Sequence, residues 1–166
     1  MAANHLPRST YFDRHRWAIL KLGGCKIAAS TIWAPLDVRP FGALRNLSIG
    51  HATFINAGFR CGVPRGATVS IGENCAIGPN VSFETVNHSL RFDPLLGRTT
   101  EVKSIEVQDR VWIGSGSIIL PGVVIGHDSV IASGSVVTKS VPPHCLYGGV
   151  PARLMRSLLN HEPAPQ

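Results

Sequence analysis

The chain has 166 residues, of which 44% are hydrophobic and 16% are charged, so it can build the core of one domain and is too apolar to be disordered. Its formal net charge is +6, but Arg and Lys are dispersed, which argues against a nucleic-acid-binding tract and is compatible with a phosphate-bearing small molecule. No apolar run approaches the roughly 18–20 residues of a membrane span, and the N-terminus lacks the order of a signal peptide, so we expect a cytoplasmic protein.

The first predicted element is a helix over residues 9–22. Ser9 or Thr10 would be its N-cap, and Gly23 is a typical stop. This helix belongs to a predicted N-terminal segment of helical and extended chain, residues 1–44.

From residue 45 the chain shows a period of six, which neither a helix nor a plain alternating strand has. Between Val107 and Pro142 the blocks read VQDRVW, IGSGSI, ILPGVV, IGHDSV, IASGSV and VTKSVP, each starting with an aliphatic residue. The same phase holds upstream in IGENCA and IGPNVS, which start at Ile71 and Ile77.

A period of six suits a triangular coil in which each block forms one short strand and one corner. The aliphatic residue points inward, and Gly, Asn and Asp serve the turns. The sequence therefore predicts an all-β fold, a left-handed parallel β-helix of hexapeptide repeats over residues 45–150, with short N-terminal and C-terminal helices. The left hand is an exception to the usual crossover rule.

Two features interrupt this repeat. The blocks at Ile49 and Ile55 are out of phase with those downstream, which predicts an insertion or a bulged corner between residues 61 and 71. A longer interruption follows Phe83, where ETVNHSLRFDPLLGRTTEVKSI predicts a loop over residues 89–104. Long loops inside compact folds are usually functional or disordered, so we expect the function near this loop.

A C-terminal helix and a loose tail are predicted for residues 151–166. Pro151 opens the run ARLMRSLLN, in which Leu154, Leu158 and Leu159 give one apolar face at helical spacing. A helix there would cover the exposed strand edges of the last coil.

The stretches IGENCAIGPNVSFETVNH and DRVWIGSGSIILPGVVIGHDSVIASGSVVTKSVPPHCLYGGVPARLMR resemble the hexapeptide-repeat acetyltransferases. That family includes galactoside, maltose and nodulation-factor O-acetyltransferases and enzymes that acetylate antibiotics and exopolysaccharides. The resemblance covers residues 45–156, with the histidine, VWIG, VTK and GVPAR in the family's order and spacing. It implies transfer of an acetyl group from acetyl-CoA to a hydroxyl of a sugar or glycan-type acceptor, in a homotrimer whose active sites lie between subunits.

By this resemblance, His88 at the root of the loop is the general base, although a lone loop histidine is more often a surface residue. A neutral imidazole near pH 7 suits removal of a proton from a hydroxyl that attacks a thioester. No Ser or Cys nucleophile with its own base is evident, so direct transfer is expected. Asn56 would stabilise the transition state, with an ordinary corner residue as the alternative. Arg65, in CGVPRG, stands near the position of the sugar transferases' acidic pair, which puts a galactoside- or maltose-like acceptor in doubt.

The resemblance also implies contacts to acetyl-CoA from Ser115, Ser133, Thr138, Lys139, Arg153 and Arg156. The cationic members would meet the phosphates of coenzyme A with charge-assisted hydrogen bonds, whereas the two serines could equally be small corner residues. Asn87 and Trp112 are the expected substrate-binding residues. Trp112 lies next to the inward position Ile113, so we expect its side chain to face outward, where it would flank the acceptor or pack between subunits.

Such a coil is also compatible with two other functions. A γ-class carbonic anhydrase needs zinc histidines that include an HxxxxH pair, and the chain has no such pair. The 4 cysteines show no CxxC or Cys/His metal spacing, so we expect reduced thiols and no metal. A non-catalytic scaffold subunit would not need the loop histidine or the basic C-terminal end, and this chain has both.

Overall fold

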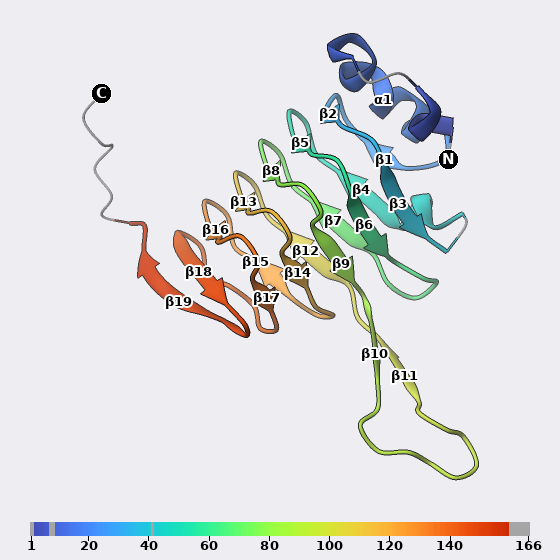
Figure 1. Ribbon diagram of the computed structural model, residues 1–166, viewed down its shortest axis with the longest axis vertical. Coiled ribbons are helices and arrows are strands. Elements are labelled where there is room, and N and C mark those ends of the chain that lie inside the picture. Colours follow the sequence, from blue (N-terminus) through green and yellow to red (C-terminus); the bar gives the residue numbers. More distant parts are fainter. Residues whose placement is uncertain (1, 7–8, 41, 160–166) are drawn as a thin grey trace.

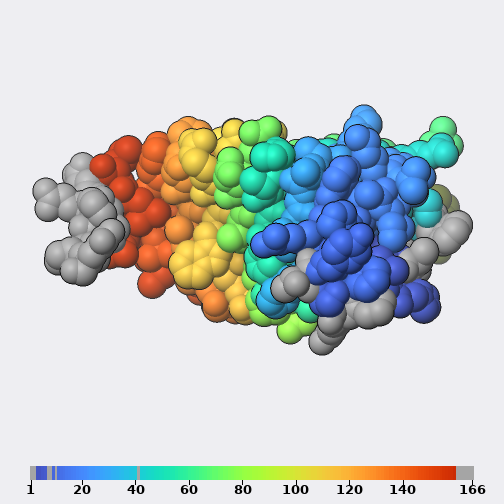
Figure 2. All heavy atoms as spheres, turned by 90° about the horizontal axis from the view of Figure 1, so that it is seen from above, coloured from blue at the N-terminus to red at the C-terminus, as the bar shows by residue number. Residues whose placement is uncertain are grey.

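The computed structural model describes residues 2–6, 9–40 and 42–159 and shows a parallel β-helix whose coils stack along one axis (Figure 1). The N-terminal helix covers one end of the stack, and the C-terminal strands form the other end (Figure 1). The coils follow one another in chain order along the long axis (Figure 2). The all-β, parallel β-helix prediction is therefore confirmed.

Three parallel sheets form the sides of the described coils. The first sheet joins β1 (Lys26–Ile27), β4 (Leu47–Ile49), β7 (Val69–Ile71), β12 (Ile105–Val107) and β15 (Val124–Ile125). The second joins β2 (Thr31–Ile32), β5 (Phe54–Ile55), β8 (Ala76–Ile77), β13 (Trp112–Ile113), β16 (Val130–Ile131), β18 (Cys145–Gly149) and, antiparallel at its edge, β19 (Ala152–Ser157). The third joins β3 (Leu36–Arg39), β6 (Phe59–Gly62), β9 (Ser82–Glu84), β14 (Ile118–Ile119) and β17 (Val136–Val137).

Three rows of corners connect these sheets. The first corner leads from the first sheet to the second and comprises residues 28–30, 50–53, 72–75, 108–111, 126–129 and 142–144. The second corner leads to the third sheet and comprises residues 33–35, 56–58, 78–81, 114–117 and 132–135. The third corner leads back to the first sheet and comprises residues 63–68, 85, 103–104, 120–123 and 138–140.

The core is the stack of inward aliphatic residues that the repeat predicts. Ile77, Ile113 and Ile131 lie in register on successive coils of the second sheet, and each is fully buried. Buried corner hydroxyls replace some aliphatic positions because they satisfy backbone groups: Ser129 Oγ donates to the Pro142 carbonyl at 2.8 Å. Burial also raises the pKa of the Cys25 and Cys61 thiols to about 12.

The predicted N-terminal helix is confirmed as α1 (Thr10–Leu22), which is capped by Ser9 and ends at Gly23. Short 3-10 turns, η1 (Ala2–His5) and η2 (Ala43–Asn46), flank the first coil. That coil, β1 to β3, already lies before residue 45, where the β-helix was predicted to begin. Its inward residues are not six positions apart, so the period cannot show it.

Both interruptions of the repeat occur where they were expected. The phase break is a longer third corner, residues 63–68, in which Gly66 adopts a φ of 96°. The predicted loop is an excursion from the same row of corners, and its root is a hairpin of β10 (Val86–His88) and β11 (Thr100–Val102). This hairpin projects well beyond the coils (Figure 1).

The predicted C-terminal helix is wrong. Residues 152–157 form β19, antiparallel to β18, so the edge of the last coil is covered by a strand. The free backbone groups of that edge favour strand pairing over the helical spacing of the leucines. Leu154 and Leu159 are exposed, and residues 160–166 of the predicted tail lie outside the described residues. No described helix is long and apolar enough to cross a bilayer.

Candidate functional site

The second corner brings together three of the predicted site residues. Ser115 and Ser133 occupy equivalent places on neighbouring coils, where Gly134 N–H donates to the Ser115 carbonyl at 2.8 Å, and both side chains are exposed. Asn56 lies on the same corner of an earlier coil, directly after β5. Successive coils stack at strand spacing, so this corner is a straight, polar edge parallel to the long axis.

Gly114, the glycine of the VWIG block, allows neighbouring coils to approach each other closely at this edge. A Cβ on Gly114 would lie 2.5 Å from the Ser133 backbone nitrogen, so any side chain here would push the next coil away. The coils can therefore stack closely, and the serine hydroxyls stand at the surface of the corner.

The amide of Asn56 is held in one orientation. Its Oδ1 accepts a hydrogen bond from Ala57 N–H at 2.7 Å, and its backbone N–H donates to the Ile77 carbonyl at 2.9 Å. With the oxygen engaged, the Nδ2 group is the end of the side chain left to donate. The side chain is half-buried, so a ligand at the second corner could reach it.

The other four residues predicted to contact acetyl-CoA are divided among different parts of the last coils. Arg153 of β19 pairs with Gly148, at the end of β18 nearest the second corner. Arg156 lies opposite Leu146, toward the first corner. Thr138 and Lys139 are exposed on the third corner, directly after β17.

His88 lies at the outer end of β10, opposite Thr100 of β11, with its side chain exposed. Its backbone N–H donates to Asn87 Oδ1 at 2.9 Å, and Asn87 is exposed as well. The hairpin leaves the coils at the third corner, whereas Asn56 lies on the second. One chain therefore does not bring the predicted base and the predicted asparagine together.

Trp112 faces outward from the second sheet between Ala76 and Val130, with 56% of its surface exposed. This confirms the predicted orientation of the ring. Arg65 is exposed in the long third corner, near the root of the hairpin.

The third sheet carries polar residues that the sequence analysis missed. Two adjoining hollows of about 440 and 380 Å³ share Asp37 and Arg60, and Glu84 lines the second. Arg39 pairs with Asp37 at 2.9 Å, and Glu84 accepts a hydrogen bond from Ser82 at 2.6 Å. The sequence pattern that could have revealed Arg60 is the apolar–polar alternation in FRC, where Arg60 points outward between buried Phe59 and Cys61.

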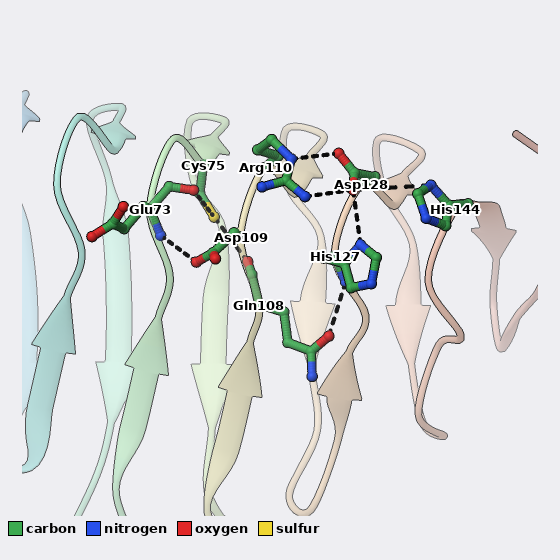
Figure 3. Close-up of polar contacts among 8 residues, drawn as sticks. All are labelled: Glu73, Cys75, Gln108, Asp109, Arg110, His127, Asp128 and His144. Carbon is green, nitrogen blue, oxygen red and sulfur yellow. Dashed lines mark hydrogen bonds and ion pairs between the residues drawn. The ribbon is translucent and has the colours of Figure 1, made fainter. Parts of the chain in front are cut away.

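A different polar network occupies the first corner (Figure 3). Arg110 donates to both oxygens of Asp128 at 2.7 and 2.8 Å, and His127 Nδ1 lies 2.8 Å from Asp128 Oδ2. The hydrogen bonds from Arg110 and then from His127 hold the pKa of the Asp128 carboxyl well below its usual range. A hollow of about 480 Å³ on the first sheet adjoins Arg110 and His127, and its lining includes none of the predicted site residues.

Comparisons with known proteins point to one family. The family of bacterial transferase hexapeptides matches residues 104–139, and the hexapeptide repeat of succinyl-transferase matches residues 68–84. The galactoside O-acetyltransferase of Escherichia coli is 39% identical over 115 residues, which are 68% of this chain and 55% of that protein. The chain thus spans about half the length of the curated relatives it matches.

Two solved structures are similar over nearly the whole chain. A hexapeptide-repeat acetyltransferase of Vibrio cholerae, complexed with acetyl-CoA, is 36% identical with a TM-score of 0.77, covering 95% of this chain and 82% of that one. A galactoside acetyltransferase in complex with coenzyme A is 31% identical with a TM-score of 0.78, covering 94% of this chain and 75% of that one.

Proposed function

The chain belongs to the hexapeptide-repeat acetyltransferase family, and from that premise we propose that it is an enzyme that transfers an acetyl group from acetyl-CoA to a hydroxyl of a sugar or glycan-type acceptor. The observation that carries the proposal is the polar edge of the second corner, with Asn56, Ser115 and Ser133 in line and Arg153 at its end. An extended thioester fits along such an edge, with its phosphates near the arginine and its acetyl group toward Asn56.

The proposed reaction is a direct transfer. The acceptor oxygen attacks the thioester carbonyl carbon while the His88 imidazole takes the hydroxyl proton. The oxyanion that forms accepts a hydrogen bond from Asn56 Nδ2, the donor end of an amide that the bond from Ala57 N–H to Oδ1 holds in one orientation. The carbon–sulfur bond then breaks, and the imidazolium returns its proton to the leaving sulfur of coenzyme A.

This chemistry needs a second subunit, because His88 and Asn56 lie on different corners of one chain. If the third corner of one subunit faces the second corner of the next, His88, Thr138 and Lys139 of one chain meet Asn56 and the serines of the other. A contact between two unlike surfaces closes into a ring when the rotation allows it, and we propose a homotrimer. The exposed apolar tip of the hairpin supports such a contact: Leu90 and Leu95 are 95% and 94% exposed.

The third sheet lies between these two corners and is therefore the proposed acceptor surface. Arg60 is exposed there, and among the described residues it has no carboxylate at ion-pair distance. It could bind an acidic group of the acceptor, while Asp37 and Glu84 could accept hydrogen bonds from sugar hydroxyls. This charge pattern, together with Arg65, favours an acceptor that is not a neutral galactoside or maltoside.

His88→Ala tests the proposal. The variant should retain its fold and its affinity for coenzyme A, while acetyl transfer falls by about 10²–10⁴, the usual contribution of a general base. Thiol release across a panel of glycan acceptors measures turnover, and calorimetry measures coenzyme A binding. His51→Ala, which removes an exposed histidine from the first corner, is the control. Unchanged turnover in His88→Ala contradicts the proposed base, and a wild-type chain that does not bind coenzyme A would favour the scaffold function.

A further inference from the structure

Three side chains of the kind that bind transition metals meet on the first corner of the last two coils. His127 and Asp128 follow β15, and His144 precedes β18. His144 N–H donates to the His127 carbonyl at 3.0 Å, so the two histidines lie close together on neighbouring coils. One potential ligand atom from each of the three residues lies within 4.8 Å of the others.

The three side chains point toward one another (Figure 3). Asp128 Oδ2 is 2.8 Å from His127 Nδ1 and 3.9 Å from His144 Nδ1. The two imidazole rings are perpendicular, with their centroids 4.8 Å apart. Two ring nitrogens thus approach the same carboxylate oxygen from different directions.

The backbone and a neighbouring side chain fix this arrangement. Asp128 and His144 have φ values of 58° and 55°, left-handed conformations that are held by the hydrogen bonds between coils. Arg110 grips both oxygens of Asp128, as the outer partners of a metal-ligating carboxylate do. The guanidinium charge opposes that of a cation, and Asp109 is a second carboxylate whose charge acts on Arg110.

We propose that His127, Asp128 and His144 form a binding site for one divalent transition-metal ion, and that zinc fits it best. Two imidazole nitrogens and one carboxylate oxygen suit zinc, whereas calcium and magnesium prefer all-oxygen sites. Tetrahedral zinc places its ligand atoms about 3.3 Å apart. The 2.8 Å between Asp128 Oδ2 and His127 Nδ1 must therefore widen, and the 3.9 Å between Asp128 Oδ2 and His144 Nδ1 must shorten, each by about half an ångström. The side chains are 41%, 30% and 35% exposed, which leaves access for the ion and for a water as fourth ligand.

Such an ion would connect the last regular coil to the residue that precedes β18. It would thereby hold the β18–β19 edge, since Leu158 N–H also donates to the His144 carbonyl at 2.7 Å. The site does not adjoin the third sheet and takes no part in the proposed transfer chemistry. We expected no metal from the sequence because the cysteines show no metal spacing and the histidines no HxxxxH pair, and neither pattern includes two histidines as far apart as His127 and His144.

Zinc titration of the metal-stripped, tag-free full chain tests this site. The wild-type chain should bind one zinc ion per subunit in calorimetry. His127→Gln and His144→Asn should each weaken that binding by at least about tenfold, since even the outer partners of a metal are commonly worth that much. Asn is chosen at residue 144 because it tolerates the left-handed conformation.

His51→Gln is the matched control. His51 occupies the place of His127 on an earlier coil. Asn74 N–H donates to the His51 carbonyl, just as His144 N–H donates to the His127 carbonyl. This variant should bind zinc like the wild-type chain. A wild-type chain without stoichiometric binding, or His127→Gln and His144→Asn variants that bind zinc as tightly as the control, would overturn the proposal.

Cobalt replacement gives a readout that needs no variant. Cobalt bound to the wild-type chain through two imidazoles and a carboxylate should give the intense visible absorption of a four- or five-coordinate ion. The weak spectrum of the hydrated ion would also overturn the proposal. Neither measurement needs coenzyme A or an acceptor, so both are independent of the proposed acetyl transfer.

Discussion

The first and second corners of this β-helix both turn through a residue in the left-handed conformation, but they expose chemically different side chains. On the first corner the left-handed positions of the later coils are occupied by Arg110, Asp128 and His144, whose side chains bind one another. On the second corner the corresponding turns use Gly116 and Gly134, next to the exposed hydroxyls of Ser115 and Ser133.

The difference shows how one repeating scaffold separates two kinds of site. Because glycines and serines have small side chains, the second corner is flat and its Ser115 and Ser133 side chains are exposed, which suits a long ligand that lies across several coils. Charged and imidazole side chains fill the first corner with contacts between neighbouring coils, which suits an ion of small radius. Changes on one corner should therefore leave the other unaffected.

The largest effect is expected from Gly114→Val on the second corner. The Cβ of the new side chain would lie 2.5 Å from the backbone nitrogen of Ser133, so the next coil must move. Overpacking of this kind costs about 1–3 kcal/mol, and the displaced serine should weaken coenzyme A binding as well. Thermal unfolding measures the loss of stability, and calorimetry measures the loss of coenzyme A affinity.

Gly116→Asn is the control for this variant. Nothing lies within 4 Å of a Cβ at residue 116, and Asn tolerates the φ of 69° found there. Equal losses in the two variants would contradict the close approach of the coils.

A smaller effect should separate the two corners directly. Arg153→Ala removes a cation from the end of the second corner and should weaken coenzyme A binding by roughly tenfold, as expected for the loss of one charge-assisted hydrogen bond. Arg110→Gln removes the same charge from the first corner and should leave that affinity unchanged. Its stability should fall only slightly, because exposed ion pairs contribute little. Calorimetry with coenzyme A compares the two variants, and an equal loss of affinity would show that charge acts through the whole molecule.

The regular parts of the fold were predictable because their cause is local. The inward Ile113 and Ile131 recur at a fixed spacing, and Ser9 and Gly23 carry their own capping chemistry. The strand β19 was not predictable from local pattern, since its partner is the free edge of β18 and its leucines mimic a helix. The first coil was missed because its inward Ile27, Ile32 and Leu36 do not keep the period.

The candidate site was predictable only where a residue keeps its place in the repeat. Ser115 and Ser133 were expected at corners and lie there. The Arg60 and Glu84 surface and the His127–Asp128–His144 cluster depend on which coils are neighbours, so residues distant in sequence meet. Neighbouring coils also decide that Asn56 and His88 lie apart in one chain, which no spacing along the sequence shows.

Complementation between two inactive variants tests most directly whether two subunits complete each site. His88→Ala and Asn56→Ala chains should each be inactive in acetyl transfer when expressed alone. Co-expressed at equal levels, they should regain about a quarter of the wild-type turnover, because in a ring with unlike contacts about one site in four receives an intact histidine from one chain and an intact asparagine from its neighbour. A mixture no more active than either variant would contradict a site shared between subunits.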